Sequence, residues 1–142
     1  MSAPFSLSCS LPADSLYQLA DGRFQLIANG PIAPLMTGFD YVLAEKPLAE
    51  FLFARGLERV RFLPAIIYRR GTGEEYHTHE QLLVGQRFSS TSIRDVALDG
   101  ERLLLMDERY LFASPSLKEV LAESQFDYLQ FSEGLSEFVA ST

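Results

Sequence analysis

The sequence has few of the residues from which common sites are built. Its 142 residues include one cysteine, Cys9, and two histidines, His77 and His79. A single cysteine cannot form an internal disulfide and excludes the cysteine sets of structural zinc sites. No phosphate-binding glycine loop, nucleophile elbow or Ser-x-x-Lys motif is present. We therefore expect a protein that is not an enzyme and needs no cofactor.

Long apolar runs are also absent. No stretch approaches the roughly 18 to 20 uncharged apolar residues that span a bilayer. The first basic residue is Arg23, so the N-terminus lacks the charged region of a secretory signal peptide. These two absences predict a cytoplasmic protein without a membrane partner.

Basic residues are outnumbered by acidic ones. Twelve Lys and Arg stand against 19 Asp and Glu, which gives a net charge of -7. A field of this sign opposes binding to nucleic acid and is compatible with a basic protein partner. The apolar share of 47% is that of an ordinary globular protein. With this length, it predicts a single domain over residues 1–142.

An internal repeat is the main organising feature, because residues 41–62 can be laid over residues 110–131 without a gap. Each copy starts with an aromatic and aliphatic run typical of a buried strand. Apolar residues at helical spacing follow, and then an alternating strand pattern. In the second copy, Ser116 and Glu119 predict a capping box at the start of the helix. The identical pairs are Tyr41/Tyr110, Ala44/Ala113, Leu48/Leu117, Glu50/Glu119, Leu52/Leu121 and Phe62/Phe131.

The residues between the copies predict mostly sheet. The turn at residues 71–73 joins two strand patterns, and Asp99-Gly100 is the strongest hairpin signal in the chain. We therefore expect an α+β domain. In it, two strand–helix–strand units, the pseudo-repeat units 41–62 and 110–131, flank a mainly antiparallel central sheet.

The two histidines are separated by one residue. On a strand their side chains would point to the same side, so both imidazoles could reach one metal ion. Gly71-x5-His77-x-His79 matches the start of the first cupin motif. Leu83 and Val84 stand where that motif needs a glutamate, and no third histidine exists. We predict no metal site, and a small cupin-like metal-binding protein stays an alternative.

Acidic residues gather around the two predicted central hairpins. Carboxylates with interleaved aromatic residues suit the capture of a basic protein surface, and the alternative is a solvated sheet face. The predicted partner-binding residues are Glu74, Glu75, Tyr76, Glu80, Asp95, Asp99, Glu101, Asp107 and Glu108.

The repeated unit resembles the recurring segment of a known family. The pattern starts at Asp40-Tyr41, continues through leucines at positions 48, 52 and 57, and ends at Phe62-Leu63-Pro64. With its near copy from Tyr110, it is similar to small bacterial immunity proteins of polymorphic-toxin and type VI secretion systems, formerly a domain of unknown function. Residues 114–131 are similar to the segment that closes this family's domain, although Gln125 stands where glycine is common.

The resemblance implies a non-enzymatic protein that binds a cognate effector toxin and blocks it. Such proteins act in the cytoplasm when the toxin acts there. The acidic charge adds the expectation of a toxin with a basic surface, and a nuclease whose active site is occluded is the candidate that this charge indicates. A structural or oligomerising domain is the remaining alternative. The oligomeric state and the identity of the toxin are left open.

Overall fold

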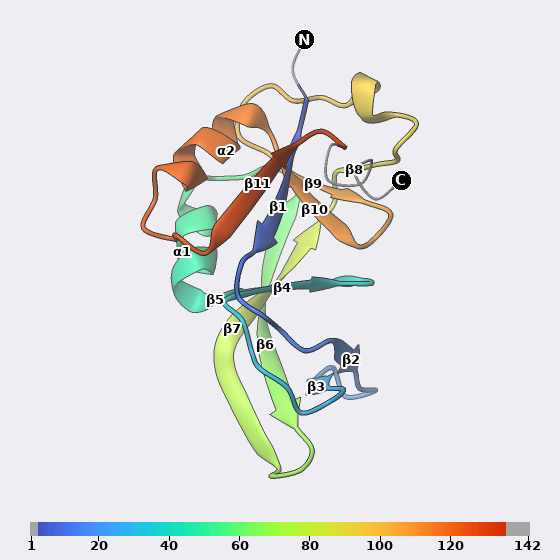
Figure 1. The fold of residues 1–142 in the computed structure, drawn as a ribbon, viewed down its shortest axis with the longest axis vertical. Coiled ribbons are helices and arrows are strands. Elements are labelled where there is room, and N and C mark those ends of the chain that lie inside the picture. Colours follow the sequence, from blue (N-terminus) through green and yellow to red (C-terminus); the bar gives the residue numbers. More distant parts are fainter. Residues whose placement is uncertain (1–2, 136–142) are drawn as a thin grey trace.

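The computed structural model describes residues 3–135 (Figure 1). Over this range the chain forms one α+β domain with eleven strands in two sheets and two α-helices. The elements in chain order are β1 (Phe5–Cys9), β2 (Leu16–Gln18), β3 (Phe24–Leu26), β4 (Leu35–Gly38), β5 (Tyr41–Glu45), α1 (Lys46–Ala54), β6 (Val60–Arg69), β7 (Glu74–Val84), β8 (Arg87–Phe88), the 3-10 turn η1 (Ile93–Asp95), β9 (Leu103–Met106), β10 (Tyr110–Ala113), α2 (Pro115–Ala122) and β11 (Leu129–Glu133).

The strands form two sheets, so the prediction of one central sheet is wrong on this point. One sheet has the order β11-β1-β10-β9-β8, and the other has the order β2-β3-β6-β7-β5-β4. Neighbouring strands are antiparallel except for β3 with β6 and β8 with β9. The segments 41–62 and 110–131 therefore contribute to different sheets.

Elements in the two similar segments start at matching positions. The paired starts, each 69 residues apart, are Tyr41 and Tyr110 for the first strand, Lys46 and Pro115 for the helix, and Val60 and Leu129 for the last strand. The two strands of a segment never pair with each other. Instead β7 lies between β5 and β6, and β1 lies between β10 and β11.

The inserted strands β7 and β1 also share a register. Leu82 of β7 pairs with Phe62, as Leu7 of β1 pairs with Phe131. On the other side, Glu80 pairs with Ala44 as Phe5 pairs with Ala113. Each inserted strand is antiparallel to both of its neighbours. The strands β6-β7-β5-β4 of one sheet therefore have the same arrangement as β11-β1-β10-β9 of the other, down to the pairing of individual residues.

One apolar cluster joins both sheets and both helices. Leu48 and Leu52 of α1 and Leu117 and Leu121 of α2 are at most 2% exposed. They pack in the same cluster as residues of β1, β7, β9 and β10. Two smaller clusters cover the other faces of the sheets. The helices thus lie against a core that both sheets share (Figure 1).

The predicted capping box at Ser116 is wrong, because α2 starts at Pro115 and Ser114 is its N-cap residue. The side chain of Ser114 is fully buried and serves a different contact. Its hydroxyl donates to the Gly100 carbonyl at 2.7 Å and accepts from the Arg102 N–H at 2.8 Å. Ser114 therefore fixes the segment that enters β9.

The hairpin predicted at Asp99-Gly100 is also wrong. Residues 93–95 form η1, and no strand precedes Asp99 between β8 and β9 among the described residues. The hairpin in this region joins β9 to β10 through residues 107–109. Asp99 is held instead by Arg102, whose Nε donates to the Asp99 carbonyl at 2.7 Å. Hydrogen bonds from Arg102 and Ser114 therefore hold Asp99 and Gly100 in place, and the local sequence does not predict the one from Ser114.

Candidate partner-binding face

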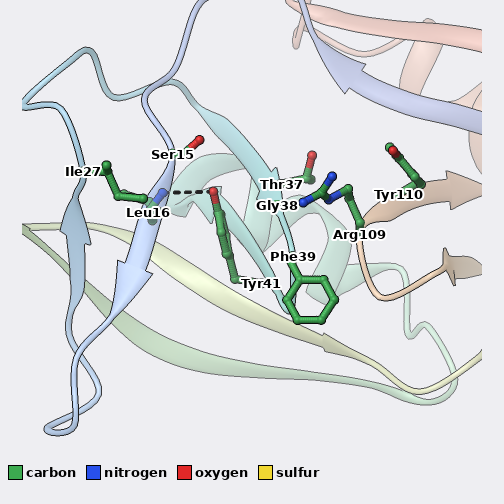
Figure 2. Close-up of a pocket in the computed structure, with 9 residues that line it drawn as sticks. All are labelled: Ser15, Leu16, Ile27, Thr37, Gly38, Phe39, Tyr41, Arg109 and Tyr110. Carbon is green, nitrogen blue, oxygen red and sulfur yellow. Dashed lines mark hydrogen bonds between the residues drawn. The ribbon is translucent and has the colours of Figure 1, made fainter.

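A cavity of about 510 Å³ opens where three separate segments meet (Figure 2). The segments are the ribbon of β2 and β3, the β4–β5 turn and the β9–β10 turn. The lining residues are Ser15, Leu16, Ile27, Thr37, Gly38, Phe39, Tyr41, Arg109 and Tyr110.

Backbone contact between the two turns places the cavity walls. Gly38 pairs with Tyr41, so Phe39 and Asp40 form a two-residue turn. The Asp40 N–H donates to the Glu108 carbonyl of the β9–β10 turn at 2.8 Å. Asp40, Asp107 and Glu108 all have positive φ, a conformation that aspartate tolerates better than most residues. The turns are therefore tied together at their tips.

Tyr41 forms one wall of the cavity. Its ring packs against Gly38, where any Cβ would collide with it. Its hydroxyl oxygen accepts the Leu16 N–H at 3.2 Å, which links β2 to the β4–β5 hairpin (Figure 2). Within residues 3–135 the Tyr41 hydroxyl donates to no acceptor, so its hydrogen is available to a group in the cavity.

Two large apolar side chains in the cavity lining, Ile27 and Phe39, are exposed, and so is Tyr17, which follows the lining residue Leu16 in the chain. Leu16 is buried on β2, so the alternation of a strand turns Tyr17 outward, where it is 63% exposed. Ile27, just after β3, is 61% exposed, and Phe39 in the β4–β5 turn is 66% exposed. A turn of two residues cannot bring the Phe39 ring back to the core. We call the cavity, with Ile27, Phe39 and Arg109 in its lining and Tyr17 next to the lining residue Leu16, the pocket face.

Arg109 is the cation of the pocket face. Among residues 3–135 its guanidinium makes no hydrogen bond or ion pair, and its side chain is exposed. Most other arginines have partners. Arg23, Arg55, Arg87 and Arg102 form ion pairs, and Arg59 and Arg69 donate to backbone carbonyls.

Sequence reasoning missed the apolar part of this face. Tyr17, Ile27 and Phe39 come from three different elements, and each alone is typical of an ordinary strand or turn. The available signal was Phe39, an aromatic residue between Gly38 and Asp40 in a turn.

Four of the predicted acidic residues are bound to arginines within the chain. Glu75 pairs with Arg23 at 3.0 Å, and Asp99 pairs with Arg102 at 3.3 Å. Glu101 and Glu108 pair with Arg55 and Arg87, respectively. Hydrogen bonds from the guanidinium groups lower the pKa values of Asp99 and Glu101. These carboxylates are therefore partly neutralised by neighbours.

The predicted partner-binding residues are spread over the molecule. Glu74 and Glu75 begin β7 at the tip of the β6–β7 hairpin, at the bottom of Figure 1. Residues 95–101 lie in the yellow and orange segment at the top. Asp107 and Glu108 belong to the turn that contributes Arg109 to the pocket face. The structure thus brings only these last two together with the cavity.

Two further predicted residues lie on β7. Tyr76 is half-buried against the second apolar cluster, and its hydroxyl accepts from Arg69 Nε at 3.1 Å. Glu80 is half-buried between β5 and β6, opposite Ala44 and Pro64.

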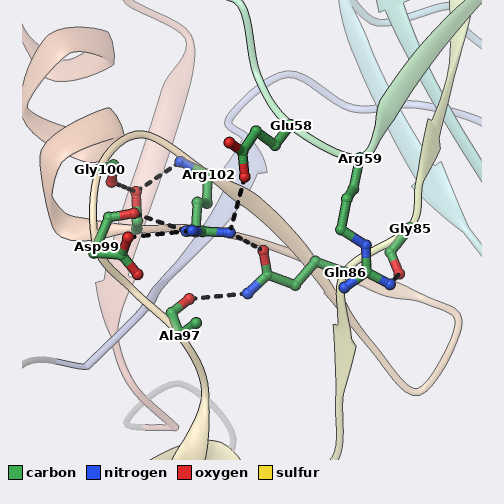
Figure 3. Close-up of polar contacts among 9 residues, drawn as sticks. Glu58, Arg59, Gly85, Gln86, Ala97, Asp99, Gly100 and Arg102 are labelled. Carbon is green, nitrogen blue, oxygen red and sulfur yellow. Dashed lines mark hydrogen bonds and ion pairs between the residues drawn. The ribbon is translucent and has the colours of Figure 1, made fainter.

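Asp99 belongs to a polar network around Arg102 (Figure 3). The Arg102 guanidinium also donates to Gln86 Oε1 at 3.1 Å and lies 3.8 Å from Glu58. The amide of Gln86 donates to the Ala97 carbonyl at 2.9 Å. This network connects the irregular segment before β9 to Gln86 and Arg102, and we interpret it as structural.

The two histidines lie in different environments. Ala65 pairs with His79 while Ile67 pairs with Tyr76, so β7 carries a bulge beside His77. His77 is exposed, whereas His79 is 4% exposed. His79 Nε2 is 2.8 Å from the Ala33 carbonyl and Nδ1 is 2.8 Å from Thr78 Oγ1. Both nitrogens of His79 are therefore occupied.

Both histidines border a second cavity of about 580 Å³. Within residues 3–135, no group of three or more His, Cys, Asp and Glu side chains is placed to hold a metal ion. Burial of the His79 ring lowers its pKa, and the Ala33 carbonyl and Glu45 offset part of this effect.

Comparison with known proteins finds no family model, no curated protein and no solved structure that matches this chain. Neither helix in the described part of the chain combines the length and the apolar character needed to cross a bilayer.

Proposed function

We propose that this protein acts by binding another protein through the pocket face, and that the partner is a bacterial effector toxin which it neutralises as an immunity protein. The observation that carries the binding function is the exposure of Ile27 and Phe39 in the lining of one cavity, with Tyr17 exposed next to the lining residue Leu16. The toxin as partner comes from the family resemblance of the repeated segment.

The residue types of the pocket face suit a protein interface. Aromatic residues and arginine dominate binding energy at interfaces, whereas large contiguous apolar patches are uncommon on proteins that act alone. Full burial of an aromatic or branched aliphatic side chain contributes about 1.5 to 3 kcal/mol. Three such side chains could offset much of the cost of association.

The position of the face follows from the repeat. We treat residues 41–62 and 110–131 as two copies of one strand–helix–strand unit, each preceded by a strand and a short turn. The turns that precede Tyr41 and Tyr110 meet through the Asp40–Glu108 backbone hydrogen bond. The binding face then lies where the turns that precede the two copies are in contact.

Carboxylates around the face support a basic partner surface. Asp40 and Asp107 are exposed in the two turns, and the whole chain has a net charge of -7. Such charges raise the rate of encounter with a positively charged protein more than they raise the affinity. These charges would therefore guide a basic toxin to the side of the cavity formed by the β4–β5 and β9–β10 turns.

The test compares two equally exposed phenylalanines in the purified protein. Phe39 is 66% exposed on the pocket face, and Phe53 on α1 is 68% exposed. The partner is first isolated by affinity capture from the source cells, and its toxicity is measured with and without this protein. We expect Phe39→Asp to weaken binding at least about 30-fold, roughly 2 kcal/mol, and to abolish protection. Phe53→Asp should leave both unchanged.

Two results would contradict the proposal. Equal weakening by both substitutions would show that the pocket face is not the interface. A bound partner whose toxic activity is unaffected would remove the immunity function and leave only binding.

A further inference from the structure

We infer that the cavity of the pocket face receives a carboxylate side chain of the partner, an Asp or Glu that pairs with Arg109. The inference rests on the proposed function, since it names the partner's chemistry at the same site.

The cavity lining has a charge opposite to that of the whole chain. Among the acidic residues between positions 3 and 135, none lines this cavity. The charged group among the lining residues is Arg109, and four of the others carry hydroxyl groups, namely Ser15, Thr37, Tyr41 and Tyr110. On an acidic protein, this lining forms a local site for an anion.

The state of Arg109 decides which occupant fits. A partner that covered the cavity with apolar or basic groups would bury the guanidinium without a counter-charge, and an unpaired buried charge is costly. A carboxylate would instead form charge-assisted hydrogen bonds with the guanidinium. The hydroxyl of Tyr41 lines the same cavity and has its hydrogen free to donate to an acceptor there, because its oxygen already accepts from Leu16.

The apolar walls favour a side chain over a free ion. Ile27 and Phe39 flank the cavity and are both more than 60% exposed (Figure 2). The methylene groups of a glutamate, or the residues next to an aspartate, would cover these surfaces. An inorganic anion would leave both side chains in water.

The arrangement separates the roles of charge at the face. The exposed carboxylates of Asp40 and Asp107 attract a basic surface, and the cavity selects one acidic residue within it. A partner with an acidic surface and a basic residue at the cavity would place carboxylates next to Asp40 and Asp107 and a cation next to Arg109. The repulsion between these like charges would exclude such a partner.

The experiment uses the full-length protein and displayed random peptides. Peptides are selected on the wild-type protein and kept if Phe39→Asp abolishes their binding. We expect Asp or Glu in the selected sequences. One such peptide is then compared with its acid-to-amide twin, Glu to Gln or Asp to Asn, on wild type, Arg109→Met and Arg109→Lys.

The expected result is a double-mutant cycle with strong coupling. On wild type, the amide twin should bind at least about tenfold more weakly. On Arg109→Met the two peptides should bind equally, and Arg109→Lys should restore part of the preference. Arg109 is exposed, so these variants are expected to fold, and far-UV circular dichroism checks this.

Three outcomes would overturn the inference. The first is equal binding of both peptides to the wild type, and the second is a selection without acidic enrichment or without any peptide dependent on Phe39. The third is displacement of the peptide by acetate or phosphate at the peptide's own concentration, which would indicate a site for free anions. A peptide that meets all expectations while the protein protects against no toxin would uphold the cavity chemistry and refute the immunity function.

Discussion

At the scale of single residues, buried polar side chains are held by several contacts, while some large apolar side chains are exposed. Ser114 and His79 are buried and hydrogen-bonded on both sides. Among the described residues, no buried side-chain nitrogen or oxygen lacks a partner. Phe39 and Ile27 are exposed, as Phe53 on α1 is, but these two line one cavity. This placement is the reason that we propose the pocket face as a contact surface.

His79 should make the stability of the protein depend on pH. Burial lowers the pKa of its ring, so the folded state stays neutral where the unfolded chain binds a proton. The free energy of unfolding should therefore fall as the pH drops below about 6.5, by at most about 1.4 kcal/mol per pH unit from this residue. Urea unfolding from about pH 7 to about pH 5 measures the slope.

The matched control for this prediction is the exposed His77. His79→Gln should flatten the acid slope, whereas His77→Gln should retain it. An unchanged slope in His79→Gln would show that the ring becomes protonated in the folded state without loss of stability.

At the scale of elements, local patterns predicted most helices and strands. The helix stripes and strand runs of residues 41–62 and 110–131 depend on neighbours in sequence, and both helices and the β6–β7 hairpin are where these patterns placed them. The bulge in β7 and the loss of the Asp99-Gly100 hairpin depend on distant residues. No local pattern encodes such contacts.

The candidate site was less predictable for the same reason. A sequence shows how many carboxylates a segment carries but not which of them an arginine neutralises. Glu101 is bound by Arg55, which lies 46 positions earlier in the chain, at 2.6 Å. The cavity itself requires three segments that only the fold brings together. The binding role of the predicted acidic residues stays a prediction.

Ser114 gives a stability test of one element boundary. Ser114→Ala removes the hydroxyl that accepts from the Arg102 N–H and donates to the Gly100 carbonyl. Leaving these groups without a partner should lower the free energy of unfolding by about 1 to 3 kcal/mol. Ser116→Ala, on the exposed side of α2, should change it by less than about 0.5 kcal/mol. Denaturant titration measures both, and a larger loss in Ser116→Ala would restore the capping box predicted from sequence.

At the scale of the whole molecule, the two repeated segments and the sheets that contain them do not form separate domains. The cluster that contains Leu52 of α1 and Leu121 of α2 includes residues of both sheets. The inserted strands strengthen this union, because β1 completes the sheet of the second segment and β7 that of the first. Each half therefore depends on a strand from outside its own repeated segment.

This shared core predicts a single unfolding transition. Leu52→Ala and Leu121→Ala should each lower the free energy of unfolding by about 2 to 5 kcal/mol, because each leaves a cavity in the same cluster. Tyrosine fluorescence and far-UV circular dichroism should report coincident transitions for both variants. A variant that loses one signal before the other would indicate two independent halves.

The most direct test of partner binding through the pocket face is amide hydrogen exchange of the protein alone and in complex with its captured partner. We predict slower exchange on binding at residues 15–17, 27, 37–41 and 107–110. Residues 70–75 at the tip of the β6–β7 hairpin and residues 93–102 should be unaffected. Protection confined to either of those two segments, with none around Phe39, would contradict the account and move the interface to the acidic residues predicted from sequence.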